Sequence, residues 1–372
     1  MRVLFLVPDL VSIGGIQRYC RLAVASLDRC LSERGGCLSV FSLNDTPPPR
    51  LAEELRALRS TELVYFSGRR VAFLRRFTSA VRGSTAIIYG LLGFAPMTFL
   101  ATLSGRRRPS ALLLYGLEAW QYRGYLYARA VRRIDNFISI SRYTLEAFRG
   151  AYGLCPGPGD MVIPNAVSPE LVNAQVIADS QPCASPRLLS VSRLAAGHDE
   201  PKGIDLVIRS LPSLLRQFPD LVYVVVGDGG DRVRLEGLAA SLGVQHAVRF
   251  LGFVSNERLE REFSGCSLFV MPSTKEGFGF VFIEAMAYGK PVVAARATAV
   301  PEVVDHGETG LLIEPGNVQQ LGESISLLLR DSVLRDRMGR AARQAVERRF
   351  TYQKFQEKWL SVCDSLIRPP RA

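Results

Sequence analysis

Two glutamates, Glu276 and Glu284, stand eight positions apart and carry side chains that can grip hydroxyl groups of a ligand. Gly277 and Gly279 lie between them, and glycines let a backbone approach a ligand closely. A helix starting there would offer free N–H groups to an anion. Glu284 falls in an apolar helical stretch, where burying an unpartnered carboxylate is costly. It could accept backbone hydrogen bonds from a neighbouring loop, but the complete string favours a carboxylate that binds ligand hydroxyls.

The elements that would position these glutamates belong to a layered α/β structure. Residues 266–272 form a short apolar run ending in a proline and predict a buried strand, and residues 291–295 predict the next one. Between them lie a glycine-containing loop and about two and a half helical turns that end at Gly289. The same alternation recurs along the chain and predicts parallel sheets.

Apolar runs elsewhere predict the rest of the framework. Residues 2–7 indicate a strand buried on both faces. Gly14 and Gly15 then precede a helix, and such a pair can admit a phosphate or a sugar, or can form a plain tight turn. Further strands are expected at residues 37–43, 63–66, 86–89, 111–115, 188–192 and 221–226, and helices at 16–30, 53–59, 204–218 and 350–367.

The string Glu276-Gly-Phe-Gly, followed by Glu284-Ala-Met-Ala-Tyr-Gly-Lys-Pro-Val, resembles the E-x7-E signature of the glycosyltransferase family 4 group. The similarity is strongest over residues 187–316 and traceable over 1–170. Members are retaining enzymes that use nucleotide sugars and have the GT-B fold. The resemblance therefore implies two Rossmann-like, doubly wound parallel-sheet α/β domains facing a cleft, with a C-terminal helix that crosses back to the first domain.

The length of 372 residues fits two domains. We expect an N-terminal acceptor-side domain over residues 1–170 and a nucleotide-sugar-binding domain over 187–350. Residues 171–186 are polar and aperiodic, as is typical of a linker. Residues 351–372 would form the returning helix.

The resemblance implies a catalytic set of Arg193, Lys202 and Glu276. Transfer from a nucleotide sugar breaks a bond to a diphosphate, and fixed cations stabilise the negative charge that grows there. Arg193 and Lys202 flank a polar loop over 195–201 and match the family's cations, although either could be a solvated surface cation. Glu276 would bind hexose hydroxyls, and Glu284 those of the ribose. The implied donor-binding residues are Gly14, Gly15, Gly252, Phe253, Val254, Gly277, Phe278, Gly279, Phe280 and Glu284.

The clearest departure from the family lies at Tyr115. Many similar enzymes have His-Gly-x-Glu-x-Trp where this chain has Tyr115-Gly-Leu-Glu118-Ala-Trp. A phenol with a reference pKa of about 10 does not act as a base at neutral pH. Tyr115 and Glu118 are therefore candidates for positioning the donor or the acceptor.

No cofactor and no metal ion are expected. The sequence has no Asp-x-Asp string, and two cations can replace a metal at the diphosphate. The histidines His198, His246 and His306 show no spacing typical of metal ligands. No dedicated general base follows from the sequence, and in retaining GT-B enzymes the leaving phosphate is thought to assist the acceptor hydroxyl.

The composition, 48% hydrophobic and 22% charged, is that of a globular protein. The opening residues before Pro8 are too few for a signal peptide. Residues 86–103 lack charge but contain Gly90, Gly93 and Pro96, and predict a strand, a turn and a short helix rather than a membrane span. Seven scattered cysteines without a Cys-x-x-Cys pair fit a reducing cytoplasm.

Positive charge is concentrated in the first half of the chain. The net charge is +11, and residues 1–180, with 22 arginines and 13 acidic residues, contribute +9 of it. Arginines between Arg69 and Arg82 alternate with apolar residues and predict a basic amphipathic helix suited to a membrane surface or to an anionic acceptor. A solvated arginine-rich face is an equal alternative. Nucleic acid is not an expected partner, since no binding module is recognised.

We therefore expect a cytoplasmic, metal-independent, retaining glycosyltransferase that moves a hexose from a UDP- or GDP-linked sugar to a glycan or lipid-linked acceptor, with peripheral membrane contact. Alternatives on the same fold are a sugar-nucleotide epimerase and a catalytically silent sugar-nucleotide-binding protein. An NAD-dependent oxidoreductase would rest only on Gly227-Asp-Gly229, because the third glycine of that fingerprint is missing.

Overall fold

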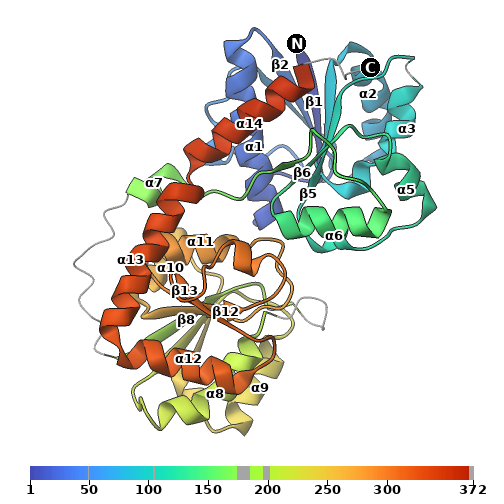
Figure 1. Ribbon diagram of the computed structural model, residues 1–372. Coiled ribbons are helices and arrows are strands. Elements are labelled where there is room, and N and C mark those ends of the chain that lie inside the picture. Colours follow the sequence, from blue (N-terminus) through green and yellow to red (C-terminus); the bar gives the residue numbers. More distant parts are fainter. Residues whose placement is uncertain (49, 104, 174–184, 196–201, 368–372) are drawn as a thin grey trace. The chain divides into compact units, whose positions relative to one another are not determined.

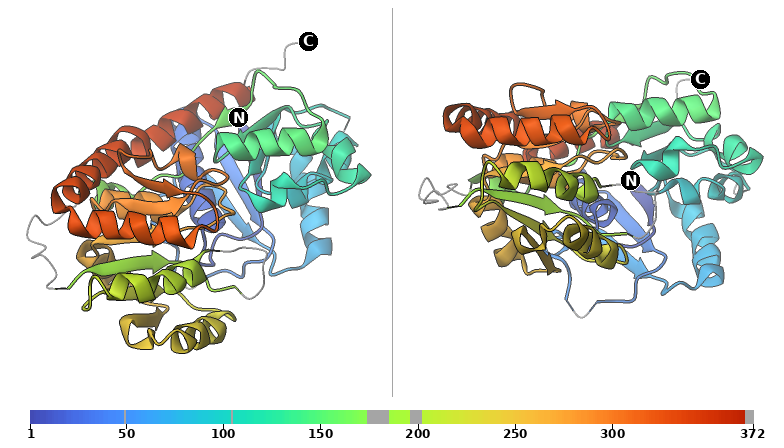
Figure 2. Two further views of the ribbon diagram at one scale, coloured as in Figure 1. Left: turned by 60° about the horizontal axis from the view of Figure 1, so that its bottom comes forward. Right: turned by 90° about the horizontal axis from the view of Figure 1, so that it is seen from below.

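The computed structural model contains two compact units, one formed by Met1–Asn165 with the residues from Gln353 on, the other by Ala166–Tyr352 (Figure 1). Each unit is built on its own parallel sheet with helices on both faces (Figure 2). The predicted architecture of two doubly wound α/β units is confirmed. The structure describes residues 1–48, 50–103, 105–173, 185–195 and 202–367.

The predicted linker over 171–186 lies largely outside the described residues. Its first residues belong to helix α7 (Pro169–Asn173), which packs against helix α11 (Phe280–Ala287) in the second unit. The backbone N–H of Val167 also donates to the carbonyl of Phe350. The second unit therefore begins at Ala166, before residue 171, where the linker was expected to start, and before residue 187, where the second domain was expected to start.

The first unit has a seven-stranded sheet of order β3-β2-β1-β4-β5-β6-β7. β1, β4 and β5 are almost wholly buried, as expected for central parallel strands covered on both faces. The strands are β1 (Arg2–Val7), β2 (Cys37–Ser42), β3 (Thr61–Tyr65), β4 (Ala86–Tyr89), β5 (Ser110–Leu114), β6 (Asn136–Ser139) and β7 (Met161–Val162).

Helices α2, α3 and α5 pack side by side in the first unit (Figure 1). Helix α1 packs against the C-terminal helix α14 (Tyr352–Ile367). Tyr19 of α1 makes edge-on ring contacts with Phe355 at 5.2 Å and with Trp359 at 6.3 Å. The predicted return of the C-terminal helix to the first unit is confirmed. The helices are α1 (Gly15–Glu33), α2 (Arg70–Gly83), α3 (Met97–Thr102), α4 (Leu117–Trp120), α5 (Tyr125–Val131) and α6 (Arg142–Tyr152), with 3-10 turns η1 (Glu53–Leu55) and η2 (Leu92–Phe94).

The predicted helix over 53–59 is wrong beyond its first turn, η1. The backbone N–H groups of Arg59 and Ser60 donate to the carboxylate of Asp28 at 2.9 and 2.8 Å. These hydrogen bonds to a buried carboxylate of α1 hold the chain in a non-helical conformation that continues into β3. Helix propensity alone did not reveal this contact.

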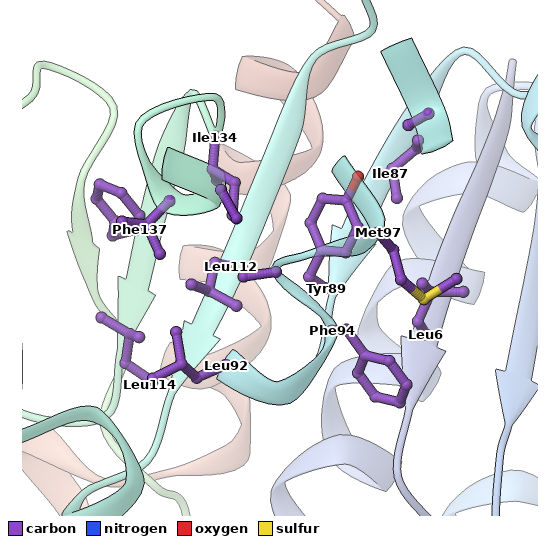
Figure 3. Packing of buried hydrophobic residues seen from close by; sticks show 14 of the residues in the cluster. Leu6, Ile87, Tyr89, Leu92, Phe94, Met97, Leu112, Leu114, Ile134 and Phe137 are labelled. Carbon is purple, nitrogen blue, oxygen red and sulfur yellow. The ribbon is translucent and has the colours of Figure 1, made fainter. Parts of the chain in front are cut away.

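The core of the first unit joins the central strands to the layer of α2, α3 and α5. Side chains from β1, β4 and β5 interlock with those of η2 and α3, as Figure 3 shows for Leu6, Tyr89, Phe94, Met97 and Leu112. Residues 86–103 supply β4, η2 and α3, so the prediction of a broken segment is confirmed. Among the described residues, no helix has the length and hydropathy needed to cross a bilayer.

The second unit has a six-stranded sheet of order β10-β9-β8-β11-β12-β13. Its strands are β8 (Arg187–Val191), β9 (Val222–Val226), β10 (Val248–Gly252), β11 (Leu268–Met271), β12 (Val292–Ala295) and β13 (Gly310–Ile313). Its helices, besides α7 and α11, are α8 (Ile204–Leu215), α9 (Arg232–Ser241), α10 (Asn256–Gly265), α12 (Val318–Arg330) and α13 (Ser332–Arg349), with turns η3 (Gln245–Ala247) and η4 (Val300–Glu302).

Candidate active site

The order of strands in the second unit reverses at β8. From β8 the chain runs outward through β9 and β10, then crosses to the other side of β8 and continues through β11 to β13. In open parallel sheets a ligand crevice forms at such a switch point, beyond the carboxyl ends of the two strands. The loop after β8 carries Arg193 and Lys202, and the loop after β11 carries Glu276. The topology therefore directs both predicted loops to one crevice.

Lys202 and Glu276 meet at this switch point. The Nζ atom of Lys202 lies 2.9 Å from Oε1 of Glu276, and the two side chains are only 20% and 11% exposed. Gly203 permits this approach, since its φ of +74° is left-handed and a Cβ there would stand 2.6 Å from the carbonyl oxygen of Pro272. A cation and a carboxylate held together in this way can bind a phosphate and a sugar hydroxyl.

The backbone of Glu276 is fixed by the loop after β12. Its N–H donates to Oγ1 of Thr298 at 3.0 Å, and its carbonyl accepts from the N–H of Ala299 at 3.3 Å. Thr298 has a φ of +48°, which a β-branched residue rarely adopts because it is strained. No local pattern marks a threonine for this conformation, so the sequence did not reveal Thr298.

Arg193 lies on a loop that packs closely against the segment after β9. A Cβ on Gly227 would stand 2.0 Å from the carbonyl oxygen of Ser192, and one on Gly229 would stand 2.1 Å from that of Leu194. Both positions therefore require glycine. The two glycines that suggested a dinucleotide fingerprint instead leave room for the loop that carries Arg193. The side chain of Arg193 is exposed.

Two hydroxyls at the switch point have no hydrogen-bond partner among the described residues. They are Oγ of Ser192, after β8, and Oγ of Ser273, after β11. Ser273 is completely buried, and an unpaired buried hydroxyl is destabilising. The oxygen atoms of a bound phosphate would satisfy such donors. The predicted polar loop over 195–201 lies, apart from Ala195, outside the described residues.

Helix α11 starts beside Glu276, and no side chain caps it. The N–H groups of an uncapped first helical turn suit an anion. The N-cap residue of α11, Gly279, has a φ of +89°. Phe278 is buried and its ring packs edge-on against Phe350 at 5.4 Å, so this side chain is not offered at the surface of the turn. Glu284 is half-buried and not enclosed, because the side of α11 that faces the core carries the apolar residues of the helix.

The expected base-binding segment follows β10. Gly252 accepts a hydrogen bond from the N–H of Gly227 at 2.8 Å, which ties this segment to the loop after β9. Phe253 is 78% exposed, and an exposed ring is a surface on which a nucleotide base stacks. Val254, next to it, is half-buried.

In the first unit, the sheet order reverses between β1 and β4, and Gly14 and Gly15 lie beyond β1 at the start of α1. Gly14 is extended, with a φ of 174°, and no side chain caps α1. The carboxylate of Asp45 holds the preceding loop by accepting from the N–H groups of Leu10 at 2.6 Å and Val11 at 3.3 Å. This uncapped helix start suits an anion.

Tyr115 belongs to the core of the first unit. It is 6% exposed, its hydroxyl lies 3.1 Å from Sγ of Cys20, and its ring meets Tyr19 edge-on at 5.4 Å. Burial raises the pKa of Tyr115 well above its ordinary value. These contacts favour a packing role over the expected positioning of a substrate. Glu118 accepts from the N–H groups of Tyr115 at 2.7 Å and Gly116 at 3.2 Å, while burial raises its pKa.

The described residues contain no group of three histidine, cysteine, aspartate or glutamate side chains that could hold a metal ion. His198 lies outside the described residues. Nδ1 of His306 accepts a hydrogen bond from the N–H of Leu312 at 2.9 Å, which gives that histidine a structural contact. Independence from metal remains a prediction.

The fold is shared with solved GT-B glycosyltransferases. The Anabaena protein Alr3699/HepE, solved in complex with UDP, superposes with a TM-score of 0.78 at 23% identity, covering 98% of this chain and 100% of that one. Sucrose-phosphate synthase from Thermosynechococcus elongatus superposes with a TM-score of 0.73 at 21% identity, covering 98% of each chain. The two Rossmann-like units therefore form a GT-B fold.

Sequence comparison finds similarity to known glycosyltransferases. The family model described as glycosyl transferases group 1 matches residues 183–345. A glycosyltransferase of Methanocaldococcus jannaschii is 32% identical over 161 residues, 43% of this chain and 41% of that protein. The GDP-mannose-dependent alpha-(1-6)-phosphatidylinositol monomannoside mannosyltransferase of Mycobacterium tuberculosis is 27% identical over 371 residues, 93% of each chain. The family match lies within the second unit, and the chain is similar to glycosyltransferases of the family 4 type.

Proposed function

We propose that the protein is a retaining glycosyltransferase that moves a hexose from a UDP- or GDP-linked sugar to a glycan or lipid-linked acceptor. The observation that carries this proposal is the contact of Lys202 with Glu276 at the switch point, beside the uncapped start of α11. It supplies a cation for the diphosphate, a carboxylate for sugar hydroxyls and N–H groups for phosphate oxygens.

These groups suit the charge changes of the reaction. The bond from C1 of the hexose to the leaving phosphate oxygen breaks, and negative charge grows on the nucleoside diphosphate. Lys202, Arg193 and the first N–H groups of α11 stabilise that charge. The acceptor oxygen bonds to C1 on the face that the diphosphate leaves, and the acceptor's proton passes to the departing phosphate. The chain supplies positioning and charge, and no residue acts as base.

The donor and the acceptor are proposed from the names of relatives. The Mycobacterium tuberculosis enzyme is named for GDP-mannose and for a phosphatidylinositol mannoside, and HepE was solved with UDP. A nucleoside-diphosphate hexose and a lipid-linked acceptor suit both the crevice and the basic first unit. Such an acceptor would bring the protein to the cytoplasmic face of a membrane as a peripheral protein.

Calorimetry with UDP, GDP and their hexose conjugates tests donor binding, and turnover assays with glycan and lipid acceptors test transfer. Lys202→Ala should lower kcat/KM on the order of a hundredfold, as expected for a lost cation at developing charge. Lys354→Ala, an exposed lysine of α14, is the matched control and should leave kcat/KM unchanged.

The same assays separate the alternatives. Binding of the nucleotide sugar with neither transfer nor hydrolysis would favour a silent sugar-nucleotide-binding protein. Conversion of the sugar without an acceptor would favour an epimerase. Equal activity of the Lys202 and Lys354 variants would refute the proposed role of the crevice.

A further inference from the structure

The whole net charge of the protein lies in residues 63–134. This stretch holds twelve arginines and a single acidic residue, Glu118. Since the chain has 46 basic and 35 acidic residues, the remainder carries 34 of each and is neutral. The carboxylate of Glu118 is bonded to backbone N–H groups of the same stretch and is half-buried. The stretch is therefore strongly basic, whereas the rest of the protein carries no net charge.

The fold gathers this charge on one helical layer of the first unit. α2, α3 and α5 all come from this stretch, and α3 packs against both other helices (Figure 1). All but one of the arginines are exposed; the exception is Arg108, which donates to the carbonyl of Ser84. We name the outer surface of α2, α3 and α5, with the loops that follow α3 and precede α5, the basic layer.

Apolar side chains are exposed among these arginines on α2. Phe73, Phe77 and Val81 face the core, whereas Val71 and Leu74 are 65% and 41% exposed. Their spacing from Arg75 and Arg82 places these apolar and basic side chains on one side of the helix. The predicted amphipathic helix over 69–82 is therefore confirmed, and the structure adds that its outer side is itself mixed apolar and basic.

The same mixture recurs at α5 and after α3. Tyr125 and Leu126 are 71% and 56% exposed, and Leu103, just after α3, is 81% exposed. The guanidinium of Arg129 lies 5.6 Å from the centre of the Tyr125 ring. Exposed Leu and Tyr beside arginine form an arrangement typical of bilayer interfaces, where aromatic rings sit at headgroup level and arginines meet anionic lipid.

We propose that the basic layer is a docking surface for a bilayer containing anionic lipids. Charge complementarity selects an anionic partner, and the exposed apolar residues select a lipid surface, because a hydrated polyanion has no apolar interior to receive them. The surface extends the proposed function, since it would hold the enzyme where a lipid-linked acceptor lies, but docking itself requires neither donor nor turnover.

The test is cosedimentation of the full-length protein with vesicles of phosphatidylglycerol and phosphatidylcholine, and with phosphatidylcholine alone. We expect binding only to the anionic vesicles, weakening steeply with salt. The triple change Arg70→Gln, Arg75→Gln and Arg82→Gln should lower the partition coefficient by about fivefold per arginine, roughly a hundredfold in total. The control triple removes the exposed arginines Arg216, Arg337 and Arg340 from the neutral part and should change binding less than about twofold.

A second pair of variants tests the apolar component. Val71→Ser with Leu126→Ser should weaken vesicle binding without altering its salt dependence. Absence of binding to anionic vesicles at low salt, or equal loss in the two arginine triples, would overturn the proposal. So would unchanged binding of the serine variant, which would indicate a soluble polyanion as the ligand. Nucleotide affinity by calorimetry should be the same in all these variants, so failure of docking is distinguishable from failure of the proposed activity.

Discussion

Gly203 and Pro272 touch at the switch point of the second unit. A Cβ on Gly203 would lie 2.6 Å from the carbonyl oxygen of Pro272 and 2.7 Å from its Cγ. The contact joins the start of α8 to the end of β11, and Lys202 and Glu276 flank it in sequence. Because it involves backbone on both sides, neither partner can yield as a flexible side chain would. This contact helps to set the distance between the lysine and the carboxylate.

Gly203→Ala should therefore destabilise the protein by more than its backbone conformation alone requires. A left-handed alanine costs about 1 kcal/mol, and the overlap with Pro272 should add about 1–3 kcal/mol. Gly243→Ala is the matched control, since Gly243 has a φ of +70° but open space around its Cβ position. Urea unfolding measures both variants, and equal losses would show that the contact with Pro272 is unimportant.

Ser273→Ala should have opposite effects on stability and on ligand binding. Its buried hydroxyl lacks a partner among the described residues, so its removal should leave the free energy of unfolding unchanged or raise it by up to about 1 kcal/mol. If the hydroxyl donates to the nucleotide, affinity should fall about fivefold or more. Ser190→Ala should instead destabilise, because its hydroxyl is bonded to Tyr223 at 2.8 Å.

Thermal unfolding with and without UDP or GDP measures both effects for Ser273. A variant that binds nucleotide as well as the unmodified protein would remove this serine from the proposed site.

The sequence predicted the framework well where burial dominates. The apolar run over 2–7 became β1 with the expected bounds, and the broken segment over 86–103 became β4, η2 and α3. The prediction of a helix over 53–59 was wrong because the carboxylate of Asp28, remote in sequence, accepts hydrogen bonds from the N–H groups of Arg59 and Ser60. Local patterns do not contain such contacts.

The candidate site was predictable as a set of residues but not as an arrangement. The motif identified Lys202 and Glu276 separately, and only folding brings these residues, 74 positions apart, to 2.9 Å. Thr298 and Ser273 carry no local signal, because a strained φ and an unpaired hydroxyl are tertiary properties. Tyr115 lay on a family motif, yet its contacts with Cys20 and Tyr19 are those of a core residue.

Tyr115→Phe tests that reassignment. The hydroxyl contacts Cys20, a weak partner, so its loss should cost about 0.5–1.5 kcal/mol of stability. Turnover should change less than about threefold, because a buried side chain that packs against Cys20 and Tyr19 is not expected to reach a substrate. Since burial raises the pKa of Tyr115, the pH–rate profile should show no limb from this residue at neutral pH. A loss of activity as large as that of Lys202→Ala would restore a positioning role.

Buried thiols should make the protein less stable at alkaline pH. Burial raises the pKa of Cys266 to about 12, and its Sγ donates to the carbonyl of Phe263 at 3.3 Å. In the unfolded chain a cysteine has a pKa of about 8.5. Between these values the unfolded state has lost the proton that the folded state retains. The stabilising contribution is thus complete below about pH 8.5 and is lost as pH rises toward 12, by about 1.4 kcal/mol per pH unit.

Urea unfolding between pH 8 and 10 under reducing conditions measures this slope, and comparing variants cancels the contribution of buried tyrosines, which all variants share. Cys266→Ala should make the fall in unfolding free energy shallower by about 1.4 kcal/mol per pH unit above pH 9, because one retained proton is removed. Cys155→Ala is the control, since Cys155 is exposed and should leave the slope unchanged. Cys20, whose pKa burial also raises to about 12, should behave like Cys266. An unaltered slope in Cys266→Ala would mean that this thiol titrates alike in the folded and unfolded chains, contrary to its burial in the second unit.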